Sequence, residues 1–180
     1  MRLRCLLIAC LLASPFAVLA DNINKEWGYW NDHDKDCQNT ETEFLIDKSL
    51  DPVEYSKDNC KITAGTWISS YTGELIVKRK KIVVDHIIST EWALEHGAES
   101  WSSEKKSIFA NDTQNLLAVD KRSVKKKNNR SPAKYLPVTN QCSYAKRWES
   151  LLKKYELAPP KKLEKTLKLT IYKTSLKKTK

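Results

Sequence analysis

Several patterns that would assign a function class are missing from this sequence. It contains no Cys-x-x-Cys pair, and the spacing of its five cysteines matches no zinc finger. No Gly-x-Ser-x-Gly context supports a Ser-His-Asp triad, and no internal repeat is present. A zinc finger, a serine hydrolase and a repeat architecture are therefore not favoured.

Negative charge is also in short supply. The 180 residues include 22 Asp and Glu against 32 Lys and Arg, which gives a formal net charge of +10 and a pI near 9.3. This balance suits an acidic polymer as the partner, with nucleic acid as the first candidate. A solvated charged surface without such a partner is the alternative.

The N-terminus has the pattern of an export signal. Arg2 and Arg4 precede an apolar run, Cys5 to Leu19, and small residues occupy the two signal-peptidase positions in Val18-Leu19-Ala20. The run is short and ends abruptly, which favours a secretory signal cleaved after Ala20 over a membrane anchor. An uncleaved anchor and a lipoprotein box at Leu7-Ile8-Ala9-Cys10 are the alternatives. We expect a secreted or periplasmic protein without membrane contact after cleavage.

The remaining chain is long enough for one domain, which we place at residues 21–157, followed by a loosely held basic tail at 158–180. Hydrophobic periodicity predicts an α+β fold with a central β-hairpin and helices packed round it. Expected strands cover 60–67, 74–78 and 82–86, and 115–119 is a strand or a loop. A first short helix is expected after an N-cap at Thr40. Further helices are expected over 91–96, 102–109, 131–136 and 144–155.

Three cysteines remain after signal cleavage. An oxidising compartment favours one disulfide among them, which we place between Cys37 and Cys60. Cys142 is then free or pairs differently.

The sharpest local signal is Asp85-His86, which follows the β-branched run Ile82-Val83-Val84. Adjacent residues at a strand end point to opposite faces, so one can bind a divalent ion while the other activates water. A carboxylate suits a hard cation such as Mg²⁺, and a neutral imidazole suits a general base. A surface acid beside a core histidine is the alternative.

Further motifs stand in order around this pair. They are Cys37-Gln38-Asn39-Thr40, Cys60-x-Ile62-x-x-Gly65-x-Trp67, Tyr71-Thr72-Gly73, Gly97-Ala98-x-x-Trp101, Asn111-Asp112, Asn115-Leu116, Pro132-Ala133-x-x-Leu136-Pro137 and Cys142-x-Tyr144. The ordered set resembles the secreted HNH endonuclease family over roughly residues 27–157. The resemblance implies the ββα-metal (HNH) finger, a fold that nuclease colicins also use, and phosphodiester hydrolysis with a divalent ion.

The resemblance also implies roles for single residues. Asp85 takes the position of a metal ligand, His86 that of the general base, and Asn115 that of the residue that orients the base. Val124 stands where the family has a metal-binding Asn. Asn128 lies one helical turn further on the same face, as in the nuclease colicins, and would complete the metal site with Asp85. The implied ion is Mg²⁺, with Mn²⁺ as the alternative.

A basic cluster surrounds the expected metal helix and predicts contacts to a phosphate backbone. Its members are Lys121, Arg122, Lys125, Lys126, Lys127 and Arg130. We expect a monomeric endonuclease that cuts DNA, or RNA as well, with little sequence preference. The alternative is a domain that has lost turnover through Val124 and binds nucleic acid or a protein partner without cleavage.

Overall fold

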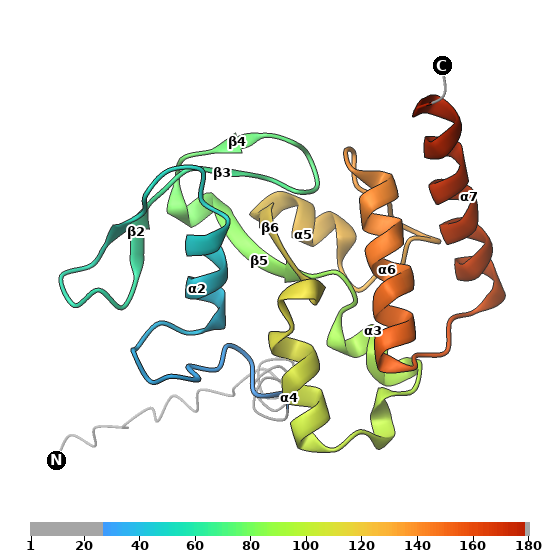
Figure 1. Cartoon of the computed structure of the whole chain (residues 1–180), viewed down its shortest axis with the longest axis horizontal. Coiled ribbons are helices and arrows are strands. Elements are labelled where there is room, and N and C mark those ends of the chain that lie inside the picture. Colours follow the sequence, from blue (N-terminus) through green and yellow to red (C-terminus); the bar gives the residue numbers. More distant parts are fainter. Residues whose placement is uncertain (1–26, 179–180) are drawn as a thin grey trace, which may run out of the picture.

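The computed structural model describes residues 27–178, with side chains up to residue 173, and has the predicted α+β architecture. Small antiparallel sheets are surrounded by helices (Figure 1). The helices are α2 (Thr40–Asp47), α3 (Thr90–Glu95), α4 (Ser103–Asn111), α5 (Lys121–Lys127), α6 (Gln141–Tyr155) and α7 (Lys161–Lys178). The strands are β1 (Glu54–Tyr55), β2 (Ile62–Ala64), β3 (Trp67–Ile68), β4 (Leu75–Ile76), β5 (Ile82–His86) and β6 (Leu116–Asp120). The expected export signal lies outside the described residues.

The central sheet is the β5–β6 ladder, and a long connection containing α3 and α4 joins its strands. It runs antiparallel from Ile82 opposite Asp120 to His86 opposite Leu116. Helix α5 follows β6 directly, because the Asp120 carboxylate caps it by accepting from the backbone N–H of Ser123 at 2.9 Å. Two strands and the helix that follows give the ββα arrangement that the resemblance implies.

The hairpin expected at the centre of the fold lies instead beside the main ladder. β3 and β4 pair antiparallel across the turn at Gly73, as the sequence predicts. β2, however, pairs with β1 rather than continuing this hairpin. The correction has a physical cause: β5 and β6 are the strands whose apolar residues face two cores, so they take the central position.

Two buried clusters lie on opposite faces of the β5–β6 ladder. On the α2 side, Ile82, Leu116 and Ala118 pack with residues of α2 and β3. On the other face, buried Val119 and partly buried Val83 join the larger cluster formed with α3, α4, α6 and α7. In Figure 1 the ladder accordingly crosses the middle of the molecule, between α2 and α6. This alternation fixes the register, since a slip by one residue would expose both clusters.

Two local expectations need correction. The N-cap of α2 is Asn39 rather than Thr40, because the Asn39 side chain accepts from the backbone N–H of Thr42 at 3.0 Å. Asn is at least as good a cap as Thr. The short helix expected at 131–136 is a turn, in which the N–H groups of Lys134 and Tyr135 both donate to the Ser131 carbonyl.

The segment expected as a loosely held basic tail contains α7, which packs along α6 (Figure 1). Leu163 and Leu167 are buried and Ile171 is partly buried. Their spacing of four residues places them on one face of the helix. Burial of this apolar stripe against α6 holds the segment in place, and Lys161, Lys162, Lys165, Lys168 and Lys173 are exposed.

Cys37 and Cys60 form the expected disulfide, which ties the loop before α2 to the end of the β1–β2 hairpin. Cys142 carries a free thiol. None of the described helices is both long and apolar enough to cross a membrane.

Candidate active site

Asp85 and His86 stand at the end of β5, where the central ladder stops. Asp85 lies opposite Leu117, and His86 lies opposite Leu116. Leu117 packs with the large cluster and Leu116 with the cluster on the α2 side. Strand alternation therefore sends the two side chains to opposite faces of the sheet, as the sequence predicts.

The imidazole of His86 is held by one backbone carbonyl. Its Nε2 lies 2.7 Å from the carbonyl oxygen of Ala110, at the end of α4. A carbonyl can only accept, so Nε2 carries the proton and Nδ1 is the basic nitrogen of the neutral ring. Nδ1 has no hydrogen-bond partner in the described part of the chain, and it is not among the fully buried polar atoms without a partner.

Two aromatic rings from the start of the described chain cover His86. The centroids of Tyr29 and Trp30 lie 5.2 and 5.4 Å from the imidazole, and Trp30 stacks almost parallel to it, at 9°. His86 is only 8% exposed as a result. Burial lowers the pKa of His86 below its usual 6.5, against the hydrogen bond to Ala110 and the charge of Asp85, which raise it. The ring is therefore neutral, and able to accept a proton, at pH 7.

The carboxylate of Asp85 has two internal partners. Its Oδ2 accepts from the Tyr71 hydroxyl at 2.7 Å and pairs with the Lys127 ammonium at 3.1 Å. The same ammonium donates to the backbone carbonyl of His86 at 2.6 Å. The Lys127 side chain is 1% exposed and that of Asp85 is 15% exposed. A buried lysine from α5 thus joins the backbone of the candidate base to the neighbouring carboxylate.

Asn115 is fully buried and fixes the backbone just beyond His86. Its side-chain amide accepts from the N–H of Ile88 at 2.9 Å and donates to the Ile88 carbonyl at 3.1 Å. Its own carbonyl accepts from the N–H of Ile87 at 2.7 Å. The structure therefore brings Asn115 to the segment that carries the base, rather than to the imidazole itself.

The predicted basic cluster is divided by the structure. Lys127 is buried, whereas the other five members are exposed. Three of these five, Lys121, Arg122 and Lys125, line one groove of about 500 Å³ between α5 and β4. The groove also contains three lysines outside the predicted cluster: Lys78, Lys80 and Lys81. They precede β5 in the chain, and their run of positive charge was the signal that could have found them.

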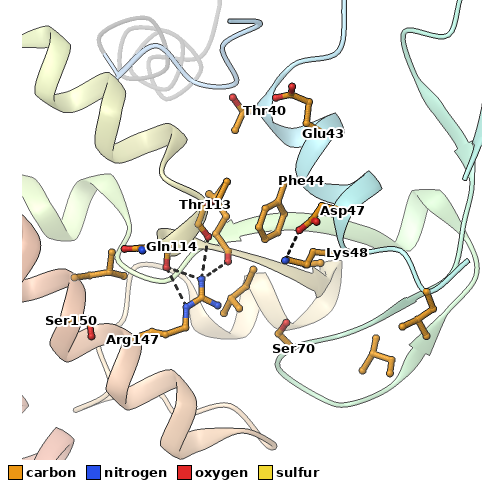
Figure 2. A pocket seen from close by; sticks show the side chains of 16 residues that line it. Thr40, Glu43, Phe44, Asp47, Lys48, Ser70, Thr113, Gln114, Arg147 and Ser150 are labelled. Carbon is orange, nitrogen blue, oxygen red and sulfur yellow. Dashed lines mark hydrogen bonds and ion pairs between the residues drawn. The ribbon is translucent and has the colours of Figure 1, made fainter. Parts of the chain in front are cut away.

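Another hollow, of about 850 Å³, lies between α2, β6 and α6 (Figure 2). The guanidinium of Arg147 points into it, and its Nε and Nη2 donate to the carbonyls of Thr113, Gln114 and Leu116. Glu43 and Asp47 add negative charge to the same wall. Neither Asp85 nor His86 lines this hollow, and its mixed charge does not suit a phosphate backbone.

The comparisons with known proteins agree with this geometry. Residues 38–174 match the family model of the C-terminal domain of GmrSD restriction endonucleases. The chain belongs to this family. It is an HNH-type nuclease family, so the resemblance carried by the motifs is confirmed.

One curated relative of this GmrSD-type domain is an uncharacterized secreted protein of Arthroderma benhamiae, 29% identical over 126 residues. The match covers 68% of the chain and 60% of the relative, so the chain spans less than two thirds of that protein. No solved structure shows a significant match.

HNH-type nucleases generally use a divalent ion, but the donors near Asp85 do not fit one. Val124 is apolar and packs against the core, and Asn128 ends α5 as an exposed C-cap with φ +48°. Within residues 27–178, the one group of three or more acidic, His or Cys side chains with converging donor atoms is Asp32, Asp34 and Asp36, in the loop before α2. Mg²⁺ usually keeps several waters and takes one or two carboxylates from the protein, and the carboxylate available here, that of Asp85, is already paired with Lys127.

Proposed function

We propose that this chain is an exported endonuclease that hydrolyses phosphodiester bonds of DNA, with RNA as a further substrate, and with little sequence preference. One observation carries the proposal. His86 has one nitrogen fixed by a carbonyl, and its other nitrogen is basic and has no hydrogen-bond partner among residues 27–178. A histidine at the first strand of a nuclease finger, in that state, is suited to take a proton from water. Membership of an HNH-type nuclease family supports nucleic acid as the substrate class.

The chemistry assigns one task to each side chain. A water molecule attacks the phosphorus while Nδ1 of His86 accepts its proton, one ester P–O bond breaks, and the leaving oxygen takes a proton from solvent. Ala110 holds the imidazole in the required tautomer, and Asn115 holds the loop behind it. In related nucleases a divalent ion such as Mg²⁺ or Mn²⁺ stabilises the charge of the transition state. The donors around Asp85 do not support an ion in that role, because Lys127 already occupies the carboxylate.

The basic groove supplies a path for the phosphate backbone. It lies at the Ile82 end of the ladder, about 13 Å from His86 at about 3.3 Å per residue along β5. That distance corresponds to roughly four steps of 3.4 Å in a duplex. Its six cations outnumber its two carboxylates, Glu74, which pairs with Arg122, and Asp120. This excess positive charge attracts the backbone whatever the sequence, which fits an enzyme of low sequence preference.

A second candidate is a domain that binds nucleic acid without cutting it. It is favoured by Val124, which cannot coordinate an ion, and by the pairing of Asp85 with Lys127. In that case the basic groove would be retained and turnover would be absent. The two candidates share the fold and the partner but differ in a single measurable activity.

Nicking of supercoiled plasmid by the purified chain without residues 1–20 separates them. Reactions contain Mg²⁺, Mn²⁺ or EDTA, and His86→Ala is compared with His33→Ala, a matched control at an exposed histidine. The proposal predicts nicking by the wild type and by His33→Ala, and its loss in His86→Ala. Absence of nicking in every condition, with binding to the plasmid retained, would establish the second candidate. A gain of activity in Val124→Asn would show that only a metal ligand was missing.

A further inference from the structure

The Lys127 ammonium lies against Asp85, the residue to which the family resemblance assigns a metal. It is placed by α5, the helix that supplies metal ligands in the related fold, and it contacts the carboxylate of Asp85 at 3.1 Å. It also donates to the His86 carbonyl at 2.6 Å, so it joins the carboxylate of Asp85 to the backbone of His86. The side chain is 1% exposed, and it is therefore part of the interior rather than a mobile surface lysine.

We infer that Lys127 replaces the divalent ion, so that Asp85 binds no metal in this protein. One carboxylate oxygen of Asp85, Oδ2, already has the Tyr71 hydroxyl and the Lys127 ammonium as partners. A divalent ion at the same oxygen would lie beside a buried positive charge, which like-charge repulsion opposes. Val124 also opposes metal binding, because an apolar side chain packs against the core at the position where the family has a metal-binding Asn.

The buried Lys127 ammonium affects whether the site needs a divalent ion. Breaking a buried ion pair leaves an uncompensated charge, so expulsion of Lys127 by a metal is strongly opposed. On the proposed function, phosphodiester cleavage by this chain therefore does not depend on added divalent ion. The inference that Asp85 binds no metal does not depend on that function, since it concerns only whether Lys127 or an ion is paired with Asp85.

Mn²⁺ binding, followed by the EPR signal of the free ion, tests the inference directly. The exposed carboxylates of Asp32, Asp34 and Asp36 are first replaced together by Asn, because they are a second place where Mn²⁺ could bind. Asn keeps the acceptor oxygens that cap Cys37 and Gln38 in this loop. The expected result is no saturable Mn²⁺ binding in this background, and one bound ion after the further changes Val124→Asn and Lys127→Ala.

One Mn²⁺ bound by the triple variant and lost on Asp85→Asn would overturn the inference. So would plasmid nicking that EDTA abolishes and Mg²⁺ restores in the wild type. Nicking that persists in EDTA supports it. No nicking in any condition, together with no Mn²⁺ bound at Asp85, would refute the proposed function while leaving the inference in place.

Discussion

Asp85 and His86 are neighbours in the chain, but they lie in two different environments. Asp85 contacts a hydroxyl and a buried ammonium, and its surroundings are ionic. His86 contacts a backbone carbonyl and two aromatic rings, and its surroundings are neutral. On the proposed function the base side of the nuclease finger is kept, and on our inference a lysine takes the place of the metal on the other side. A strand sends the two side chains to opposite faces, so each has its own surroundings.

The ionic side should show the largest effect on stability. Lys127→Met leaves the Asp85 carboxylate without its cation, and we expect the free energy of unfolding to fall by about 3 kcal/mol. Urea denaturation measures this change. Lys126→Met, at an exposed position of the same helix, is the matched control and should change stability by less than about 0.5 kcal/mol. Equal stability of both variants would show that the pair contributes nothing.

Tyr71→Phe tests the second partner of Asp85. The hydroxyl donates to a carboxylate at 2.7 Å, and loss of a hydrogen bond to a charged group costs about 2 kcal/mol. The change should be smaller than that of Lys127→Met, since the ion pair remains. Tyr55→Phe, at an exposed position of β1, serves as the control. A larger loss of unfolding free energy for Tyr71→Phe than for Lys127→Met would show that the hydroxyl contributes more than the ion pair.

The pH dependence of cleavage links the two sides. Because burial lowers the pKa of His86, the base stays neutral below pH 6.5, and the acid limb of the pH–rate profile should lie below that value. Folding stability from this residue falls as the pH drops below 6.5, since the unfolded chain then binds the proton more readily. The Lys127 charge also lowers this pKa, so Lys127→Met should move the limb to higher pH. An acid limb at the same pH in Lys127→Met and in the wild type would show that the Lys127 charge does not affect His86.

The smallest effect is expected at the basic groove. Replacing Lys121, Arg122 and Lys125 together by Ala should reduce the slope of log K against log salt concentration for duplex DNA by about one unit per lost phosphate contact. Lys57→Ala with Lys61→Ala, in the β1–β2 hairpin, is the control pair. A slope that changes equally in both variants would mean that the groove is no special path for the backbone.

Much of the fold could be predicted from local patterns. The β-branched run at 82–84, the apolar stripe of α6 and the glycine stop after α3 each depend on neighbours in the sequence, and all are found. The pairing of β5 with β6 could not be predicted in the same way. It joins residues across the whole α3–α4 segment, and no local signal specifies that partner.

The role of Lys127 escaped prediction for a different reason. It stands in a run with Lys125 and Lys126, and composition treats the three alike. Helical phase separates them, because Lys127 lies four residues after Ser123 and shares its buried face. Asp85, His86 and Asn115 were found as candidates through the motif, whereas the Ala110 carbonyl and the covering ring of Trp30 depend on tertiary packing.

The most direct test of His86 as the base is chemical rescue. His86→Gly removes the imidazole and leaves room for a free one beside Ala110, so plasmid nicking should be lost and then restored by added imidazole. Restoration should follow the concentration of neutral imidazole as the pH is varied. Nicking by His86→Gly at the wild-type rate, with or without imidazole, would contradict the account.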